Sequence, residues 1–151
     1  SVSVPAWTSY TVKYNANGGS GAPSSQTKWK DQTLKLSTTK PTRTGYSFQG
    51  WATSASGSVA YASGANYTAN ASVILYAVWK AVTYTVQYNA NGGTGAPANQ
   101  TKTYGKTLTL SSTIPKRTSI EDNGNITEYT FKGWATSSSS TSVAYAAGVL
   151  R

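Results

Sequence analysis

Short runs of alternating apolar and polar residues, separated by breaks rich in glycine and asparagine, follow one another along this chain. In the first run, Tyr10, Val12 and Tyr14 alternate with polar residues. A period of two is typical of a β-strand with one buried face. The NANGG run at 15–19 follows directly, and its residues accept the positive φ angles of tight turns. The pattern therefore predicts a strand that ends in a turn.

Similar patterns predict more strands further along. Residues 33–36 (TLKL) alternate again, and residues 45–51 (GYSFQGW) place their aromatic side chains on one face. The run from Val73 to Trp79 is apolar at every position, which indicates a central strand or one packed on both faces. Because no segment sustains the 3.6-residue period of a helix, the expected fold class is mostly β, at most α+β, with little helix.

The sequence also repeats itself. With a shift of 74 residues (84 − 10), Tyr10 aligns with Tyr84, and 23 of the 35 positions from 10 to 44 are identical to their counterparts. The match resumes where YSFQGWATS at 46–54 aligns with YTFKGWATS at 129–137, with a shift of 83 residues (129 − 46). The second copy therefore carries nine additional residues (83 − 74).

The repeat divides the chain into three parts. Residues 1–7 (SVSVPAW) resemble the SVILYAVW run at 72–79 and are expected to be the tail strand of a preceding repeat. Residues 8–80 form a complete repeat 1, and residues 81–151 form a repeat 2 that stops before its last strand and carries the nine-residue insertion. A repeat without one strand leaves an unpaired edge. One hypothesis is therefore self-association, in which residues 1–7 are donated as a strand to a neighbouring molecule.

The composition excludes most catalytic chemistries. The chain contains no cysteine, histidine or methionine, so it lacks a thiol nucleophile, an imidazole base and soft metal ligands. No carboxylate pair is shared by the two copies, and no apolar run approaches the roughly 18 residues of a membrane span. We therefore expect a protein that is not an enzyme, uses no cofactor or metal, and has no membrane span in this segment.

The charge is strongly positive, with 13 basic and 4 acidic residues and a formal net charge of +9. Such a charge attracts anionic polymers. However, the lysines are spread along alternating segments, where solvated strand faces also explain them. Nucleic acid is disfavoured as a partner, because the aromatic residues follow strand faces common to both copies.

One short segment combines an aromatic residue with cations. Trp29 lies between Lys28 and Lys30, and an exposed ring beside lysines could contact a sugar or an anionic ligand. Thr103 takes the place of Trp29 in the second copy, so the repeat core does not require this ring. These three residues are the candidate ligand contact, and local packing under a loop is the alternative.

The inserted residues of the second copy contain an acidic cluster, formed by Glu121, Asp122 and Glu128. Oxygen-rich loops can hold calcium, but the ligand spacing of an EF-hand is not met. The Asn123-Gly124 pair lies between these acidic residues and is a strong signal for a hairpin with a type I′ turn. The insertion is therefore predicted to be a hairpin and not a metal site.

The order of the motifs resembles a known family. YNANGG, GYSFQGWAT and LYAVW occur in this order in the first copy, and the chain resembles the Listeria-Bacteroides repeat, also called the internalin B-repeat family, over almost its whole length. The resemblance implies tandem small repeats with a β-grasp-like, ubiquitin-like fold, in secreted or wall-attached bacterial proteins. The second copy departs from the pattern, because a longer segment replaces Gly45 and the closing LYAVW is absent. The resemblance supplies no catalytic residues.

The pattern, composition and resemblance lead to one functional expectation. The chain is predicted to be a non-catalytic repeat module of a bacterial cell-surface or secreted protein, placed outside the cell, where it acts as a stalk, spacer or adhesion module. The alternative is a weak glycan- or anionic-polymer-binding module. The partners expected in either case are host or bacterial surface glycans, anionic wall polymers or a host protein.

Overall fold

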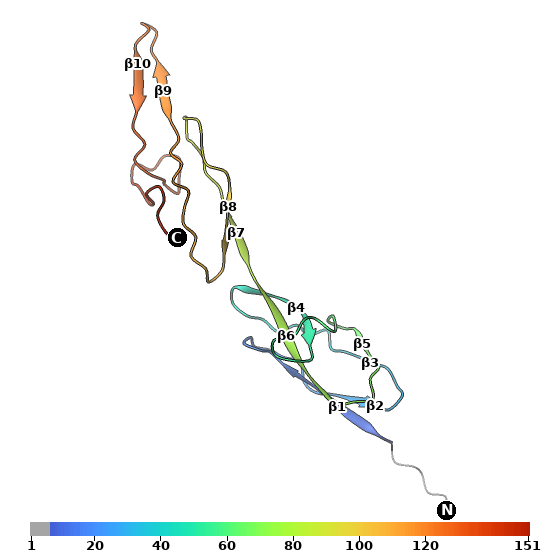
Figure 1. The fold of residues 1–151 in the computed structure, drawn as a ribbon. Coiled ribbons are helices and arrows are strands. Elements are labelled where there is room, and N and C mark those ends of the chain that lie inside the picture. The colour runs from blue at the N-terminus through green and yellow to red at the C-terminus, as the bar shows by residue number, and fades with distance from the viewer. Residues whose placement is uncertain (1–6) are drawn as a thin grey trace, which may run out of the picture. The chain divides into compact units, whose positions relative to one another are not determined.

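The computed structural model describes residues 7–151, which belong to two compact units (Figure 1). Unit 1 is Ser1–Val82 and unit 2 is Thr83–Arg151. The tail strand expected over residues 1–7 lies outside the described residues except for Trp7. From residue 7 to residue 151 the chain forms strands and loops but no helix, so the prediction of a mostly β fold is confirmed. Accordingly, none of these residues belongs to a helix that could cross a lipid bilayer.

Unit 1 is built on a four-stranded sheet in the order β2-β1-β6-β4. Its strands are β1 (Ser9–Asn15), β2 (Gln26–Trp29), β4 (Tyr46–Ala52) and β6 (Val73–Ala81). The two central strands, β1 and β6, run parallel, and each edge strand runs antiparallel to its neighbour. A short ladder also joins β3 (Leu34–Lys35) to β5 (Asn66–Tyr67). The apolar run at 73–79 is therefore a central strand, as its sequence predicts.

The core of unit 1 lies on one face of β6. Leu75 and Ala77 on this strand are fully buried, whereas the neighbouring Ile74 is 45% exposed. The buried side chains that complete the core come from four other segments and are Val12, Leu36, Trp51 and Tyr67. The outward face of β6 is thus only partly covered, and the alternation along the strand decides which side chains reach the core.

The NANGG turn is held against β6 by Trp79. The Trp79 Nε1–H group donates to the carbonyl oxygens of Ala16 (2.9 Å) and Asn17 (3.0 Å). A Cβ atom on Gly19 would come within 2.5 Å of the Trp79 ring, so this position requires glycine. Asn17 has a positive φ of 49°, and its Nδ2 group donates to the carbonyl oxygen of Ala77 (3.0 Å). The predicted strand and turn are confirmed, and the turn is bound to the last strand of the unit.

Unit 2 repeats much of this structure. Its strands are β7 (Thr83–Val86), β8 (Gln100–Thr103), β9 (Arg117–Ile120) and β10 (Ile126–Tyr129). β7 and β8 pair in the same register as β1 and β2. In unit 1 the Tyr14 hydroxyl donates to Gln26. The Tyr88 hydroxyl donates to Gln100 in the same way. Among the described residues of unit 2, no strand corresponds to β6.

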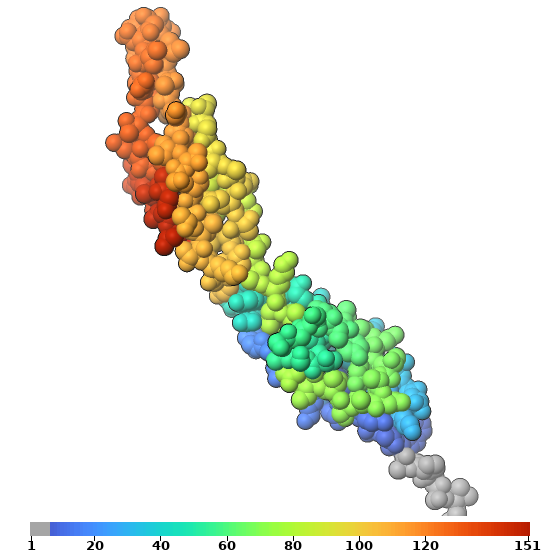
Figure 2. Space-filling model, viewed as in Figure 1, coloured from blue at the N-terminus to red at the C-terminus, as the bar shows by residue number. Residues whose placement is uncertain are grey.

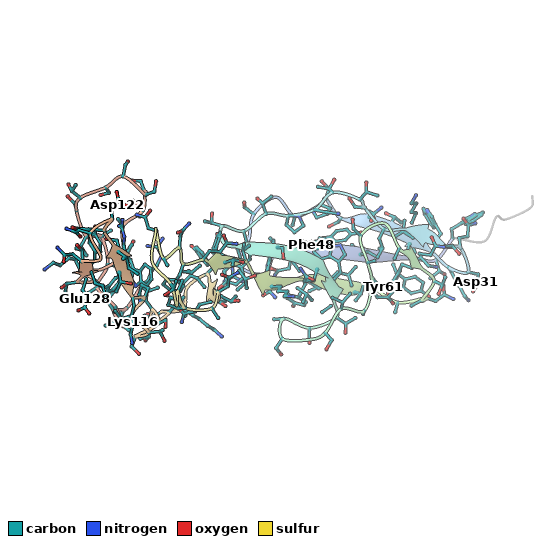
Figure 3. The ribbon with its side chains drawn as sticks, turned by 90° about the horizontal axis from the view of Figure 1, so that it is seen from above. Asp31, Phe48, Tyr61, Lys116, Asp122 and Glu128 are labelled. Atoms are coloured by element: carbon teal, nitrogen blue, oxygen red, sulfur yellow. The ribbon has the colours of Figure 1, made fainter. Side chains whose placement is uncertain are left out.

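The nine-residue insertion lies within a hairpin of β9 and β10 that projects from the rest of unit 2 (Figure 2). Gly124, with a φ of 84°, donates its N–H group to the Glu121 carbonyl oxygen (2.9 Å). The predicted hairpin is confirmed, but the predicted type I′ turn is wrong, because Asn123 lacks the positive φ that this turn requires at both central positions. A three-residue loop with glycine at its last position forms instead. Asp122 and Glu128 lie apart (Figure 3), and no three acidic side chains converge anywhere in residues 7–151.

Replacement of Leu75 by alanine should destabilise unit 1 by about 2–5 kcal/mol, because it removes a buried side chain and leaves a cavity. Ile74→Ala on the exposed face of the same strand is the matched control and should cost about 1 kcal/mol or less. Hydrogen exchange of the β1 amides in the whole chain measures the free energy of opening. Equal effects of the two substitutions would contradict the position of Leu75 in the core.

Candidate functional site

The candidate ligand contact, Lys28 with Trp29 and Lys30, lies at the end of β2. Alternation along this strand separates the three side chains. Trp29 is 42% exposed and Lys30 is exposed, whereas Lys28 is fully buried. The expectation of a solvated face for Lys28 is wrong, because Gln26 and Lys28 share the inward face of β2. The structure therefore leaves Trp29 and Lys30, without Lys28, as a surface pair.

The buried Lys28 is held by Asn70, which lies in the loop before β6. The Lys28 Nζ group donates to the carbonyl oxygen of Trp29 (2.6 Å) and to Asn70 Oδ1 (3.2 Å). Asn70 Oδ1 also accepts the backbone N–H of Asp31 (2.9 Å), and Asn70 Nδ2 donates to Asp31 Oδ1 (2.8 Å). Figure 3 labels Asp31, which follows β2. Sequence reasoning did not pair Asn70 with Lys28, because the two residues are 42 positions apart in the chain.

The surface pair is extended by a second tryptophan. Trp7 is 68% exposed, and its ring centroid lies 6.1 Å from that of Trp29 in an edge-on arrangement with an interplanar angle of 86°. The backbone N–H of Lys30 donates to the Thr8 carbonyl oxygen (2.9 Å), which holds the chain after Trp7 beside the end of β2. Two exposed indole rings thus pack together at the end of β2, and the exposed Lys30 follows directly in the chain. We call Trp7, Trp29 and Lys30 the tryptophan patch. Unit 2 has Thr103 in place of Trp29.

A second surface lies in unit 2, where a cleft has a volume of about 700 Å³. Its lining comes mainly from two segments, residues 85–91 and residues 129–138. By the repeat alignment, these correspond to residues 11–17 and 46–55 of unit 1, which contain most of β1 and all of β4. β1 and β4 are the two neighbours of β6. The cleft therefore corresponds to the position that β6 takes in unit 1.

The aromatic rings of the cleft keep the arrangement of the unit 1 core. In unit 1 the Trp51 ring packs against Tyr14 and Phe48, at centroid distances of 4.8 and 4.9 Å. The same two distances recur in unit 2 between the counterpart rings, Trp134, Tyr88 and Phe131. Burial raises the pKa of the Tyr14 hydroxyl, and a hydrogen bond from the backbone of Ser37 partly opposes this. The ring cluster thus forms in both units, with or without an adjacent β6.

Burial in the cleft is lower than in the unit 1 core. Trp51 and Ala52 are fully buried in unit 1. Their counterparts differ, since Trp134 is partly exposed and Ala135 is exposed. Part of the ring cluster is therefore open to solvent in the cleft, whose lining also includes polar side chains.

The charges around the cleft are positive. Its lining includes four basic side chains and no acidic one; the basic residues are Lys116, Arg117, Lys132 and Arg151. The Arg117 guanidinium lies 4.4 Å from the ring centroid of Tyr129, and the Arg151 guanidinium lies 4.8 Å from that of Tyr145. These contacts hold two of the cations against aromatic rings.

Both units match the same known protein family. The family model for the Listeria-Bacteroides repeat domain matches residues 10–78 and again residues 84–149. The chain belongs to this family. Listeria-Bacteroides repeats are associated with bacterial surface or secreted proteins and are generally non-catalytic. No curated protein and no solved structure matches the chain, so the β-grasp likeness of the Listeria-Bacteroides repeat stays a prediction.

The contact between Lys28 and Asn70 makes a testable contribution to stability. Asn70→Ala should destabilise unit 1 by about 1–3 kcal/mol, because it leaves the buried Lys28 ammonium with one hydrogen-bond partner fewer. Thr68→Ala, at an exposed position of the same loop, is the control and should change stability by about 0.5 kcal/mol or less. Denaturant unfolding of the whole chain measures the change in the free energy of unfolding for both variants. An Asn70→Ala variant with an unchanged free energy of unfolding would show that the stability of unit 1 does not depend on this contact.

Proposed function

We propose that this Listeria-Bacteroides repeat chain is a non-catalytic module of a bacterial cell-surface or secreted protein, and that it acts outside the cell as a stalk, spacer or adhesion module. Family membership supports the surface or secreted setting. The mechanical part of the proposal rests on one observation. Among the described residues of unit 1, the first strand, β1, and the last strand, β6, are parallel neighbours in the sheet.

Parallel pairing of the terminal strands makes unit 1 resistant to tension along the chain. Four residue pairs join these strands, from Val12 opposite Val73 to Asn15 opposite Tyr76. Tension pulls β1 toward its N-terminal end and β6 toward its C-terminal end. The hydrogen bonds between them are then loaded together in shear, and not broken one after another. A repeat held in this way keeps its length under load, as a spacer must.

Two further features support the same role. The Trp79 indole joins β6 to the turn that follows β1 through two hydrogen bonds, so side chains reinforce the strand pairing. Only Val82 separates the end of β6 from the start of β7, so the connection between the units adds little slack. Both features favour a load-bearing module over a mobile linker.

Force spectroscopy on the whole chain tests the spacer role. The chain has no native cysteine, so an introduced pair sets the points of attachment at exposed positions. Attachment through Ser9→Cys and Lys80→Cys loads the β1–β6 hydrogen bonds in shear. Attachment through Ser9→Cys and Ala71→Cys peels the same strands apart from one end. We expect a higher unfolding force for the first pair. Equal unfolding forces would show that the β1–β6 pairing does not give unit 1 its resistance to tension.

A weak glycan- or anionic-polymer-binding module is the second candidate function, and the tryptophan patch favours it. An indole face can cover the apolar face of a sugar ring, and the Lys30 ammonium attracts anionic groups. The partners of such a site are host or bacterial surface glycans or anionic wall polymers. Repetition of modules along a longer chain would supply avidity to weak single sites. Lys28 contributes no surface charge to this patch, because it is buried.

Arrays of surface glycans and wall polymers, probed at low and at physiological salt, test the binding function. Trp29→Ala and Lys30→Glu should each abolish a selective signal, because they remove the ring and the cation of the patch. Lys40→Glu makes the same change of charge at an exposed position beside the NANGG turn and should leave the signal intact. Equal losses from the two charge reversals would indicate non-specific attraction and count against a binding site.

A further inference from the structure

We propose that the cleft of unit 2 is a strand-acceptor site for an extended segment with the residue pattern of β6. In this arrangement the segment lies parallel to residues 86–89 and antiparallel to residues 129–135, and its alternate apolar side chains enter the aromatic cluster. The inference rests on the comparison of the two units and does not depend on the mechanical role proposed above.

Unit 1 shows the arrangement with the segment in place. There, β6 pairs with β1 along Val12–Asn15 and with β4 on its other side. In unit 2 the counterpart of that β1 stretch is residues 86–89, but β7 ends at Val86. Among the described residues, no ladder includes 87–89 or 130–133. Unpaired strand edges are templates for pairing with another segment.

A side-chain amide of unit 2 is placed to bind the backbone of such a segment. In unit 1, Asn17 Nδ2 donates to the carbonyl oxygens of both Ala55 (2.8 Å) and Ala77 (3.0 Å), and Ala77 belongs to β6. The counterpart Asn91 donates to the Ser138 carbonyl oxygen (2.9 Å), which corresponds to the first of these acceptors. A carbonyl oxygen of an inserted strand would supply the second acceptor.

The turn of unit 2 also offers acceptors for a tryptophan. The NANGG sequence recurs at 89–93, and Asn91 has a φ of 50°, as its counterpart Asn17 has 49°. The carbonyl oxygens of Ala90 and Asn91 correspond to the two acceptors of the Trp79 indole. A Cβ atom on Gly93 would lie 2.4 Å from the Lys116 carbonyl oxygen, so the turn keeps its tight geometry without the ring. The site therefore favours a segment that ends in tryptophan.

The charges of the cleft also restrict which segment can bind there. All the charged side chains in the lining are basic, so a basic segment would be repelled. The run at 73–79 carries no charge and is apolar at every position. An uncharged apolar strand fits the rings and is not repelled by the basic side chains of the cleft.

The N-terminal residues of a second copy are the competing occupant, and their sequence fits less well. If Trp7 takes the position of Trp79, Ser3 and Pro5 take the core positions of Leu75 and Ala77. Serine buries little apolar area, and proline lacks the N–H group that a central strand needs for its ladder. We therefore assign the site to a strand of the β6 type and make donation of residues 1–7 an outcome of the test.

The probe is a synthetic peptide with the sequence of residues 71–82, added to the whole chain. We expect one peptide to bind per chain in titration calorimetry, and slower hydrogen exchange at the amides of residues 86–89 and 130–133. A Leu75→Lys peptide places a charge in the ring cluster and should bind roughly tenfold more weakly or worse. An Ile74→Lys peptide carries the same charge on the outward face, so it meets the same repulsion from the basic lining but keeps the ring contacts. It should bind more tightly than the Leu75→Lys peptide and is also the more soluble probe.

Several results would overturn the assignment. One is the absence of binding by both the parent and the Ile74→Lys peptides, and another is equal binding of the two lysine variants. Slower exchange confined to unit 1 would show that the peptide acts on β6 and not on the cleft. A dimer of the chain that disappears when residues 1–7 are deleted would assign the cleft to a second copy.

Discussion

The position of β6 between β1 and β4 is the constraint on which the rest of unit 1 depends. β6 pairs with β1 along Val73–Tyr76 and with β4 along Tyr76–Ala81, so each part of the strand is joined to a neighbour. It also places Leu75 and Ala77 at the centre of the core, where both are fully buried. The Trp79 indole at the end of the strand then holds the turn that follows β1. One segment therefore joins the sheet, the core and the turn.

Unit 2 shows which parts of this structure form without such a strand. The NANGG turn, the register of the first two strands and the packing of three aromatic rings recur in both units. The central tryptophan is less buried in unit 2 than in unit 1, since Trp134 is partly exposed and its counterpart Trp51 is fully buried. Local turn chemistry and ring contacts are thus encoded within the first part of the repeat, and the last strand adds the exclusion of water from the core.

The proposed functions use different parts of unit 1. Resistance to tension depends on the parallel terminal strands, which lie at the centre of the sheet. Binding of a glycan depends on the tryptophan patch at the end of β2, which the repeat core does not require, because Thr103 replaces Trp29 in unit 2. A Listeria-Bacteroides repeat can therefore keep its scaffold while its surface changes. The hairpin of unit 2 illustrates this, since it extends the connection that Thr44 and Gly45 make in unit 1 without changing the ring cluster.

The sequence by itself determined the two copies, the first strand, the NANGG turn, the central apolar strand and the hairpin of the insertion, because periodicity and turn residues act over a few neighbouring positions. It did not determine the turn type at Asn123, which depends on how the two hairpin strands pair. Only the tertiary structure decided that Lys28 is buried, because its partner Asn70 is 42 residues away. It also decided that the neighbours of β6 have counterparts lining a cleft in unit 2, because pairing between strands distant in sequence follows from the packing of the whole unit and not from the pattern of any one segment.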